Sequence, residues 1–89
     1  MRDKFLELTP DLYEYMVDHG ARQDDVLRRV ERETEQLGGI AIMQIAPDEG
    51  ALLTLLVRLI GARRALEIGT FTGYSAICIA RGLGEDGSL

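Results

Sequence analysis

A glycine-containing segment near the C-terminal end of the sequence most constrains the fold. Residues 64–68 form a short, largely apolar run typical of a β-strand, and residues 69–73 contain two glycines ahead of a helical pattern over residues 74–83. A strand, a glycine turn and a helix in this order open a β–α–β unit, in which the next strand lies beside the first. A lone strand exposes unpaired N–H and C=O groups on both edges. The sequence therefore predicts an incomplete α/β fold in which Ser88 begins a second strand.

Three further helices are predicted before this unit, over residues 9–20, 23–37 and 47–60. Pro10 and Pro47 occupy first helical positions, where the fixed φ of proline and its missing N–H do no harm. Gly38 ends the second helix, and residues 40–45 form an apolar connector, either a short strand or an extended loop. The third helix is apolar nearly all round. We expect it to be buried on more than one side.

Composition and charge exclude several classes of protein. The 89 residues are 46% hydrophobic and 28% charged with a net charge of −5, which argues against a nucleic-acid partner because phosphate binding needs clustered basic residues. The N-terminal residues lack a signal-peptide core, and the apolar run 52–60 is too short to cross a bilayer. We expect a cytoplasmic protein with no membrane partner. Cys78, the single cysteine, is predicted to be a buried structural thiol, and Phe71 and Tyr74 are predicted to pack on the core.

The chemistry of the segment depends on the spacing of its glycines and on one acid. Gly69 and Gly73 are separated by three residues, so the dinucleotide fingerprint G-x-G-x-x-G is not met. Glu67, at the end of the predicted strand, suits a ligand with a cationic part better than it suits a pyrophosphate. S-adenosylmethionine (SAM), with its ammonium and sulfonium groups, is such a ligand. A turn of this kind also occurs in α/β proteins that bind no ligand, so the segment alone leaves both readings open.

The sequence resembles the cation-dependent O-methyltransferase family, which includes catechol and caffeoyl-CoA O-methyltransferases. The resemblance is carried by Leu8–Tyr15, Met43, Pro47–Gly50 and Ala65–Ala76, and it extends over essentially the whole chain. It implies that residues 1–89 are the N-terminal part of a single methyltransferase domain. The implied fold class is α/β, with N-terminal helices plus the first β–α unit of a Rossmann-like class I SAM methyltransferase.

The resemblance also implies a pocket for the methionine end of SAM. Ile45 matches a position whose backbone touches the cofactor, and Glu67 matches the acid that closes the first strand. Gly69 and Thr70 match the loop that passes under the cofactor. Ser75 matches a hydroxyl that binds the methionine carboxylate, a role consistent with a helix N-terminus, where N–H groups and the helix dipole favour an anion. The other reading of Ser75 is a simple helix cap.

The implied activity is methyl transfer from SAM to a hydroxyl of a small, aromatic acceptor. In the family a divalent cation such as Mg²⁺ holds the acceptor oxygens and lowers the pKa of the attacking one. The ribose-binding acid, the metal ligands and the catalytic residues follow later in relatives, so we expect none of them in this chain. The resemblance further implies a homodimer.

Two alternatives stay open at this stage. The chain could be non-enzymatic, a truncated fragment acting as a helical oligomerisation or regulatory module. Its apolar helix and unpaired strand predict association with the remainder of the methyltransferase domain or with another copy. A nucleotide-binding oxidoreductase half is the third reading, which the glycine spacing disfavours.

Overall fold

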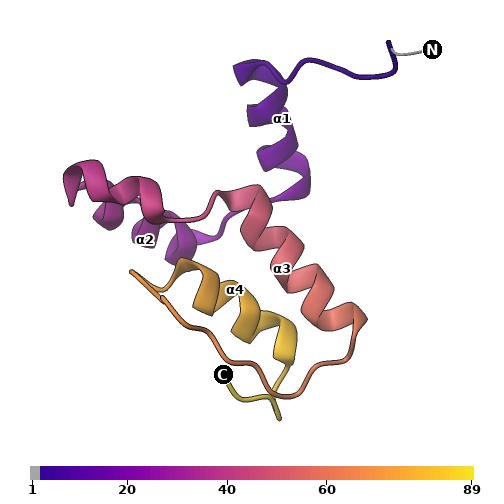
Figure 1. The fold of residues 1–89 in the computed structure, drawn as a ribbon, viewed down its shortest axis with the longest axis vertical. Helices are drawn as coiled ribbons and strands as arrows, with labels where there is room; N and C mark the ends of the chain where they lie inside the picture. The colour runs from indigo at the N-terminus through magenta and orange to yellow at the C-terminus, as the bar shows by residue number, and fades with distance from the viewer. Residues whose placement is uncertain (1–2) are drawn as a thin grey trace.

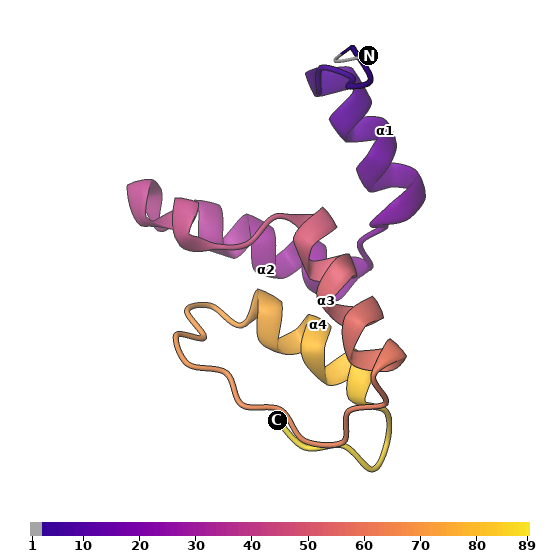
Figure 2. The same ribbon diagram turned by 45° about the vertical axis from the view of Figure 1, so that its right-hand side comes forward.

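The computed structural model describes residues 3–89, and within them it contains four α-helices and one 3₁₀ helix (Figure 1). In chain order these are α1 (Pro10–Gly20), α2 (Asp25–Glu35), η1 (Gly38–Met43), α3 (Pro47–Leu59) and α4 (Tyr74–Leu83). Helices α3 and α4 lie side by side, α2 lies across the N-terminal end of α4, and α1 projects away from the start of α3 (Figures 1 and 2). The described part of the chain is mostly helical.

Helix starts in this chain follow from local signals. Thr9 has an extended backbone, and its hydroxyl accepts a hydrogen bond from the Leu12 N–H at 3.3 Å, while Asp24 caps α2 by accepting from the Leu27 N–H at 3.0 Å. Both side chains satisfy an N–H group that has no partner within its helix. Pro47 opens α3 without a side-chain cap. The structure has a helix at each of the four predicted places, but α2 begins two residues later and ends two residues earlier than predicted.

The connector after α2 differs from its prediction. Residues 40–45 were expected to be a short strand or an extended loop, but Gly38–Met43 forms the 3₁₀ helix η1. Gly38 has a φ of 82°, which turns the chain out of α2 and lets a tighter helix begin at once. Only Gln44–Ala46 is extended, and this short link leads into α3.

Close contact between α3 and α4 makes the centre of the structure. A Cβ added to Gly50 would lie 2.8 Å from Cys78 Sγ, and one added to Gly82 would lie 2.8 Å from the Thr54 carbonyl oxygen. Thr54 Oγ1 also donates a hydrogen bond to the Cys78 carbonyl oxygen at 2.7 Å. Glycines at both ends of the contact therefore allow the two backbones to approach closely. Cys78 is 3% exposed, which confirms the predicted buried thiol.

Helix α2 is fastened to α4 by polar contacts around a small apolar cluster. Leu27, Tyr74 and Cys78 form this buried cluster, and the prediction that Tyr74 packs on the core is confirmed. Arg81 pairs with Asp24 at 2.6 Å, and Gln23 Nε2 donates to the Tyr74 hydroxyl at 2.9 Å. The Leu27 N–H and then Arg81 lower the pKa of Asp24. Helix α4 is thereby held from the α2 side at Tyr74 in its first turn and at Arg81 in its last turn.

The predicted strand over residues 64–68 is not formed within the described part of the chain. One parallel β-bridge joins Arg64 to Ser88, with the Ala65 N–H donating to the Ser88 carbonyl and the Ser88 N–H donating to the Arg63 carbonyl, both at 2.9 Å. A strand requires a partner along its whole length, and a single bridge satisfies only the first residues. The prediction of a strand was therefore wrong here, but the pairing that exists has the parallel sense expected of a β–α–β unit.

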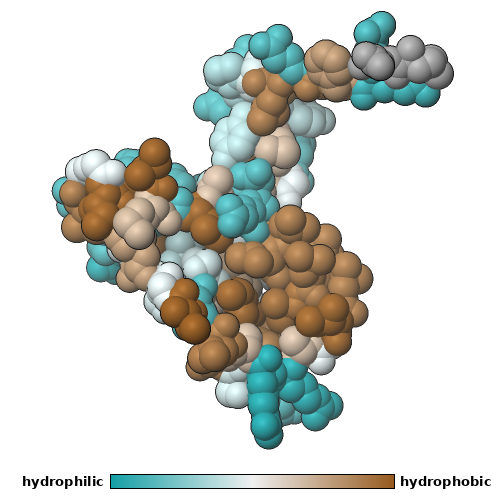
Figure 3. Space-filling model, in the orientation of Figure 1, coloured by the Kyte–Doolittle hydropathy of each residue, from teal (hydrophilic) through white to brown (hydrophobic). Residues whose placement is uncertain are grey.

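The outer face of α3 is apolar and uncovered. The exposed side chains on it and just beyond its end are Leu52, Leu55, Leu56, Leu59 and Ile60, and they contribute to the large brown surface of Figure 3. Leu66 and Ile68 are 86% and 90% exposed. The expectation that α3 is buried on more than one side was wrong, because within residues 3–89 α4 covers one face, α1 contacts α3 near its start, and the remaining side chains stay exposed.

Length and composition alone would allow the stretch Gly38–Leu59 to cross a membrane, since it has 22 residues and a mean hydropathy of 1.5. The structure divides this stretch into η1 and α3 with the extended link between them. A bilayer core offers no partners for the backbone groups that such a break frees. The 13 residues of α3 reach only about 20 Å, short of the ~30 Å of hydrocarbon. The stretch is two short helices rather than one membrane-length helix.

Candidate functional site

The glycine loop, residues 69–73, joins the extended segment to α4 in an unusual backbone conformation. Gly69, Phe71 and Gly73 have φ values of 81°, 53° and 97°, all in the left-handed region. Glycine adopts this region freely, but a residue with a Cβ atom does so at a cost. The Gly73 N–H donates to the Thr70 carbonyl at 3.0 Å and closes a turn inside the loop. A loop of this kind needs contacts from outside to keep one shape.

The loop and the link before α3 together line a small depression. Its walls come from Met43–Ile45 on one side and from Gly69–Thr72, Tyr74 and Ser75 on the other, and its volume is about 50 Å³. The structure thus brings Ile45 beside Gly69, Thr70 and Ser75, four of the five residues singled out in the sequence. Ligand pockets for drug-sized molecules usually span about 300–1,000 Å³. The depression has room for one end of a ligand such as SAM, and the ligand roles of these residues stay predictions.

Glu67, the fifth of these residues, is joined to Ser75 beside the depression. Ser75 Oγ donates a hydrogen bond to Glu67 Oε2 at 2.5 Å, a short distance typical of a hydroxyl bonded to a charged carboxylate. Glu67 Oε1 is buried and has no hydrogen-bond partner within residues 3–89. A buried carboxylate oxygen without a partner is costly, and a water molecule, an ion or a ligand that donates to it would remove that cost.

The position of Ser75 corrects one reading of that residue. Ser75 is not a helix cap, because the N-cap of α4 is Gly73 and no side chain caps this end. A hydroxyl has a single proton, and in this structure it is given to Glu67. Binding a carboxylate through Ser75 therefore requires the hydroxyl to turn away from Glu67. The first N–H groups of α4 have no partner within the helix, and they lie at the same N-terminal end of α4 as Ser75.

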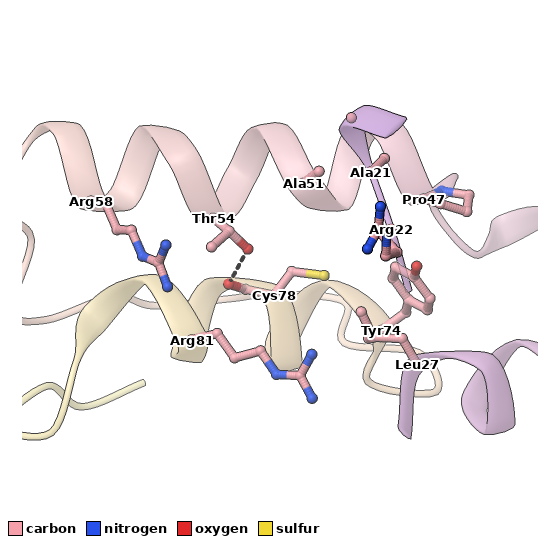
Figure 4. Close-up of a pocket in the computed structure, with 11 residues that line it drawn as sticks. Ala21, Arg22, Leu27, Pro47, Ala51, Thr54, Arg58, Tyr74, Cys78 and Arg81 are labelled. Carbon is pink, nitrogen blue, oxygen red and sulfur yellow. Dashed lines mark hydrogen bonds between the residues drawn. The ribbon is translucent and has the colours of Figure 1, made fainter. Parts of the chain in front are cut away.

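A larger cavity of about 240 Å³ lies between α3, α4 and the start of α2 (Figure 4). Thr54 on α3 and Cys78 on α4 line it beside each other, joined by their hydrogen bond, and Arg58 from α3 and Arg81 from α4 also line it. Burial raises the pKa of the Cys78 thiol, so the thiol stays protonated and is a poor nucleophile. This cavity contains none of the five predicted residues. Residues 3–89 also hold no group of three His, Cys, Asp or Glu side chains that could bind a metal ion.

Sequence reasoning missed the polar contacts that reach the loop from other helices. Thr34 Oγ1 is hydrogen-bonded to Thr72 Oγ1 at 2.9 Å, and Thr72 Oγ1 lies 3.5 Å from Gln44 Oε1. One signal was available, since Thr34 falls on the apolar stripe of α2 and a buried hydroxyl must find a partner. Phe71 is 38% exposed and does not pack on the core as predicted.

Comparison with known proteins places this chain in a family. A sequence model described as O-methyltransferase matches residues 17–89. The chain belongs to the O-methyltransferase family. All five predicted residues of this O-methyltransferase segment lie inside the matched range.

Several plant methyltransferases are similar to this chain. Caffeoyl-CoA O-methyltransferase 1 of Zea mays is 36% identical over 88 residues, which cover 97% of this chain and 34% of the maize protein. A probable caffeoyl-CoA O-methyltransferase of Arabidopsis thaliana is 37% identical over 91 residues, covering 97% and 38% of the two chains. Tapetum-specific methyltransferase 1 of the same plant is 33% identical over 90 residues, covering 98% and 39%. The O-methyltransferase segment thus spans about a third of the length of these relatives.

Proposed function

We propose that this chain forms the floor of the SAM site in an O-methyltransferase that methylates a hydroxyl group of a small, aromatic acceptor. The observation that carries the proposal is the buried Glu67 Oε1 without a partner, next to a depression lined by the residues that the family resemblance implies. Membership of the O-methyltransferase family supports the reaction class. The names of the caffeoyl-CoA relatives support an aromatic acceptor.

Each residue of the site has a role that follows from its chemistry. Glu67 Oε1 accepts hydrogen bonds from the ammonium of the methionine end, which provides the missing partner for a buried charge. The opening N–H groups of α4, with Ser75 beside them, bind the carboxylate of the same end. Ile45 and the glycine loop enclose this end from two sides. When bound, SAM supplies a methyl group on a sulfonium centre, and the role of these residues is to orient it.

The divalent cation used in the family does not fit the described residues. They contain no cluster of three possible ligands, so no step of metal chemistry is assigned to this chain. We propose that any Mg²⁺-like ion and all catalytic residues belong to parts of the methyltransferase outside these 89 residues.

The exposed apolar face of α3 supports a second part of the proposal. Such a large uncovered surface is typical of an interface, and we propose that the remainder of the methyltransferase domain or another copy covers it. The parallel bridge between Arg64 and Ser88 supports a Rossmann-like sheet at this point. Homodimer formation, a cytoplasmic location and the lack of nucleic-acid and membrane partners stay predictions. Sedimentation of the 89-residue chain tests the alternative that the chain is a helical oligomerisation module. That alternative requires an oligomer, and a well-folded monomer would contradict it.

A chimeric enzyme gives the sharpest test of the SAM site. The 89 residues replace the matching N-terminal third of the maize caffeoyl-CoA O-methyltransferase, and calorimetry measures SAM binding to the chimera, to the unaltered maize enzyme and to the chain alone. We expect Glu67→Gln to weaken SAM binding at least about tenfold, since it leaves an amide facing the ammonium. Glu49→Gln, which alters an exposed acid at the start of α3, is the matched control and should leave the affinity unchanged.

Three results would contradict the proposal or a part of it. A folded chimera that does not bind SAM would show that this chain cannot form the site. A Glu67→Gln chimera that binds as tightly as its parent would show that the buried carboxylate has no part in it. If the chain alone bound SAM as tightly as the chimera, the claim that the site is shared with other parts of the domain would be wrong.

A further inference from the structure

Thr34 is an unusually buried polar side chain on α2. It is 2% exposed, and its hydroxyl oxygen lies 2.7 Å from the Val30 carbonyl oxygen and 2.9 Å from Thr72 Oγ1. Thr72 belongs to the glycine loop, 38 residues further along the chain. The Thr34 hydroxyl shares its proton between these two oxygens, and Thr72 Oγ1 donates in turn to Gln44 Oε1 at 3.5 Å. Thr34 therefore joins the body of α2 to the loop.

The position of Thr72 makes this bond a meeting point of three segments. Its hydroxyl also lies 3.5 Å from Gln44 Oε1, on the link before α3 that lines the depression. On the other side of the loop, Gln23 holds the Tyr74 hydroxyl from the residues before α2. The loop and the start of α4 are thus held to the α2 region at two places, by Thr34 near the end of α2 and by Gln23 just before its start.

The conformation of the glycine loop explains why such fastening matters. Three of its five residues have left-handed backbones, and Phe71 adopts that conformation against its own preference. The free loop would therefore populate other shapes. A ligand that needs one shape binds more weakly in proportion to the fraction of molecules that have it.

We propose that Thr34 is a positioning residue for the cofactor, which holds the glycine loop in its SAM-binding shape through Thr72 without touching SAM itself. This inference rests on the proposed function, because it takes the depression beside the loop as the SAM site. It assigns to α2 a share of the cofactor affinity.

The test compares threonine variants in the maize chimera. Thr34→Val keeps the shape of the side chain and removes the hydroxyl, and we expect it to raise both the Kd and the KM for SAM about fivefold, as the loss of one hydrogen bond implies. The kcat at saturating SAM should stay within about twofold, because the bound loop has the same shape. Thr34→Ser retains the hydroxyl and should restore the wild-type KM.

Thr72→Val and a matched control complete the experiment. Thr72→Val removes the same bond by deleting the other hydroxyl, on the exposed residue. Because both substitutions delete one shared bond, the double variant Thr34→Val with Thr72→Val should bind SAM no worse than either single variant. Thr54→Val is the control, because Thr54 also donates from one helix to another, at 2.7 Å to the Cys78 carbonyl, but lies away from the loop. It should lower the melting temperature and leave SAM affinity unchanged.

The outcomes separate this inference from the proposed function. An unaltered chimera that fails to bind SAM overturns both. A chimera that binds SAM equally well with and without the Thr34 hydroxyl overturns the positioning role alone. An equal loss of SAM affinity in the Thr54 control also overturns it, since the effect would then reflect general stability. If Thr34→Val does not fold, Thr72→Val decides, and unchanged SAM affinity in that variant refutes the proposal.

Discussion

Adding one methyl group at Gly82 tests how closely α3 and α4 pack. In Gly82→Ala the new Cβ would lie 2.8 Å from the Thr54 carbonyl oxygen, 2.8 Å from Val57 Cβ and 2.9 Å from Val57 Cγ1. Such distances are shorter than van der Waals contact. Because one of these atoms is a backbone carbonyl and another is a Cβ, neither can move by a rotamer change. The helices must therefore shift apart.

The net effect on stability is the difference of two opposing terms. Overpacking of a tight contact costs about 1–3 kcal/mol. Alanine is better than glycine inside a helix by about 1 kcal/mol. Gly82 has no positive φ, so backbone strain does not add to the cost. We expect Gly82→Ala to lower the free energy of unfolding by about 1 kcal/mol, and by up to about 2 kcal/mol if α3 yields little.

Urea denaturation of the 89-residue chain, followed by circular dichroism, measures this difference. Gly20→Ala is the control, because Gly20 also lies in a helix but has nothing within 4 Å of an added Cβ. That variant should be neutral or slightly more stable. If Gly82→Ala gained as much stability as Gly20→Ala, the close contact between α3 and α4 would not exist in solution.

Three further predictions concern charge, burial and a contact of α1. The Leu27 N–H and then Arg81 lower the pKa of Asp24 from its ordinary 3.8. The charged carboxylate therefore stabilises the folded state above pH 3.8. This stabilisation is lost as the pH falls through the lowered pKa of Asp24 in the folded protein. Asp24→Asn should therefore be less stable than wild type at neutral pH, and the difference should shrink as the pH falls below 3.8 in urea denaturation. Cys78, buried and with a raised pKa, should react with iodoacetamide at neutral pH only after unfolding, as mass spectrometry would show. Tyr13→Phe removes a hydroxyl that donates to Asp48 Oδ1 at 3.0 Å and should lower the free energy of unfolding by about 0.5–1 kcal/mol.

Each of these predictions has a result that would contradict it. A stability difference for Asp24→Asn that does not change with pH would show that the charge of Asp24 is unimportant. Rapid labelling of Cys78 in the folded chain would show that the thiol is open to solvent. A Tyr13→Phe variant as stable as wild type would mean that α1 is not held by Asp48.

The helices could be predicted from sequence because their starts are encoded locally. Thr9 with Pro10, and Pro47 with the acids after it, act within one helical turn. The strand over residues 64–68 could not form in the same way, since its stability depends on a partner along its length and the structure supplies only the bridge to Ser88. The 3₁₀ helix was missed because its tight turns follow from the left-handed Gly38 rather than from an apolar pattern.

The candidate site was predictable where glycine spacing and an acid mark it. Glu67 and the glycine loop stand in one continuous segment, so their proximity follows from the chain itself. The bond from Ser75 to Glu67 was not foreseen, because it depends on how α4 turns back beside the extended segment. The contact of Thr34 with Thr72 joins residues 38 positions apart, and no local pattern specifies that pairing.

The hydrogen bond between Ser75 and Glu67 has a consequence for ligand selection. A ligand that accepts the Ser75 hydrogen bond leaves Glu67 Oε2 without its donor, in addition to the buried Oε1. A ligand with only a carboxylate accepts from Ser75 but gives Glu67 no donor. A ligand with only an ammonium donates to Glu67 but leaves the bond from Ser75 to Glu67 in place. A zwitterion carries a carboxylate acceptor and an ammonium donor a few bonds apart. It can therefore accept from Ser75 and donate to Glu67 at the same time. The site thus favours an amino-acid end group over either of its charges alone.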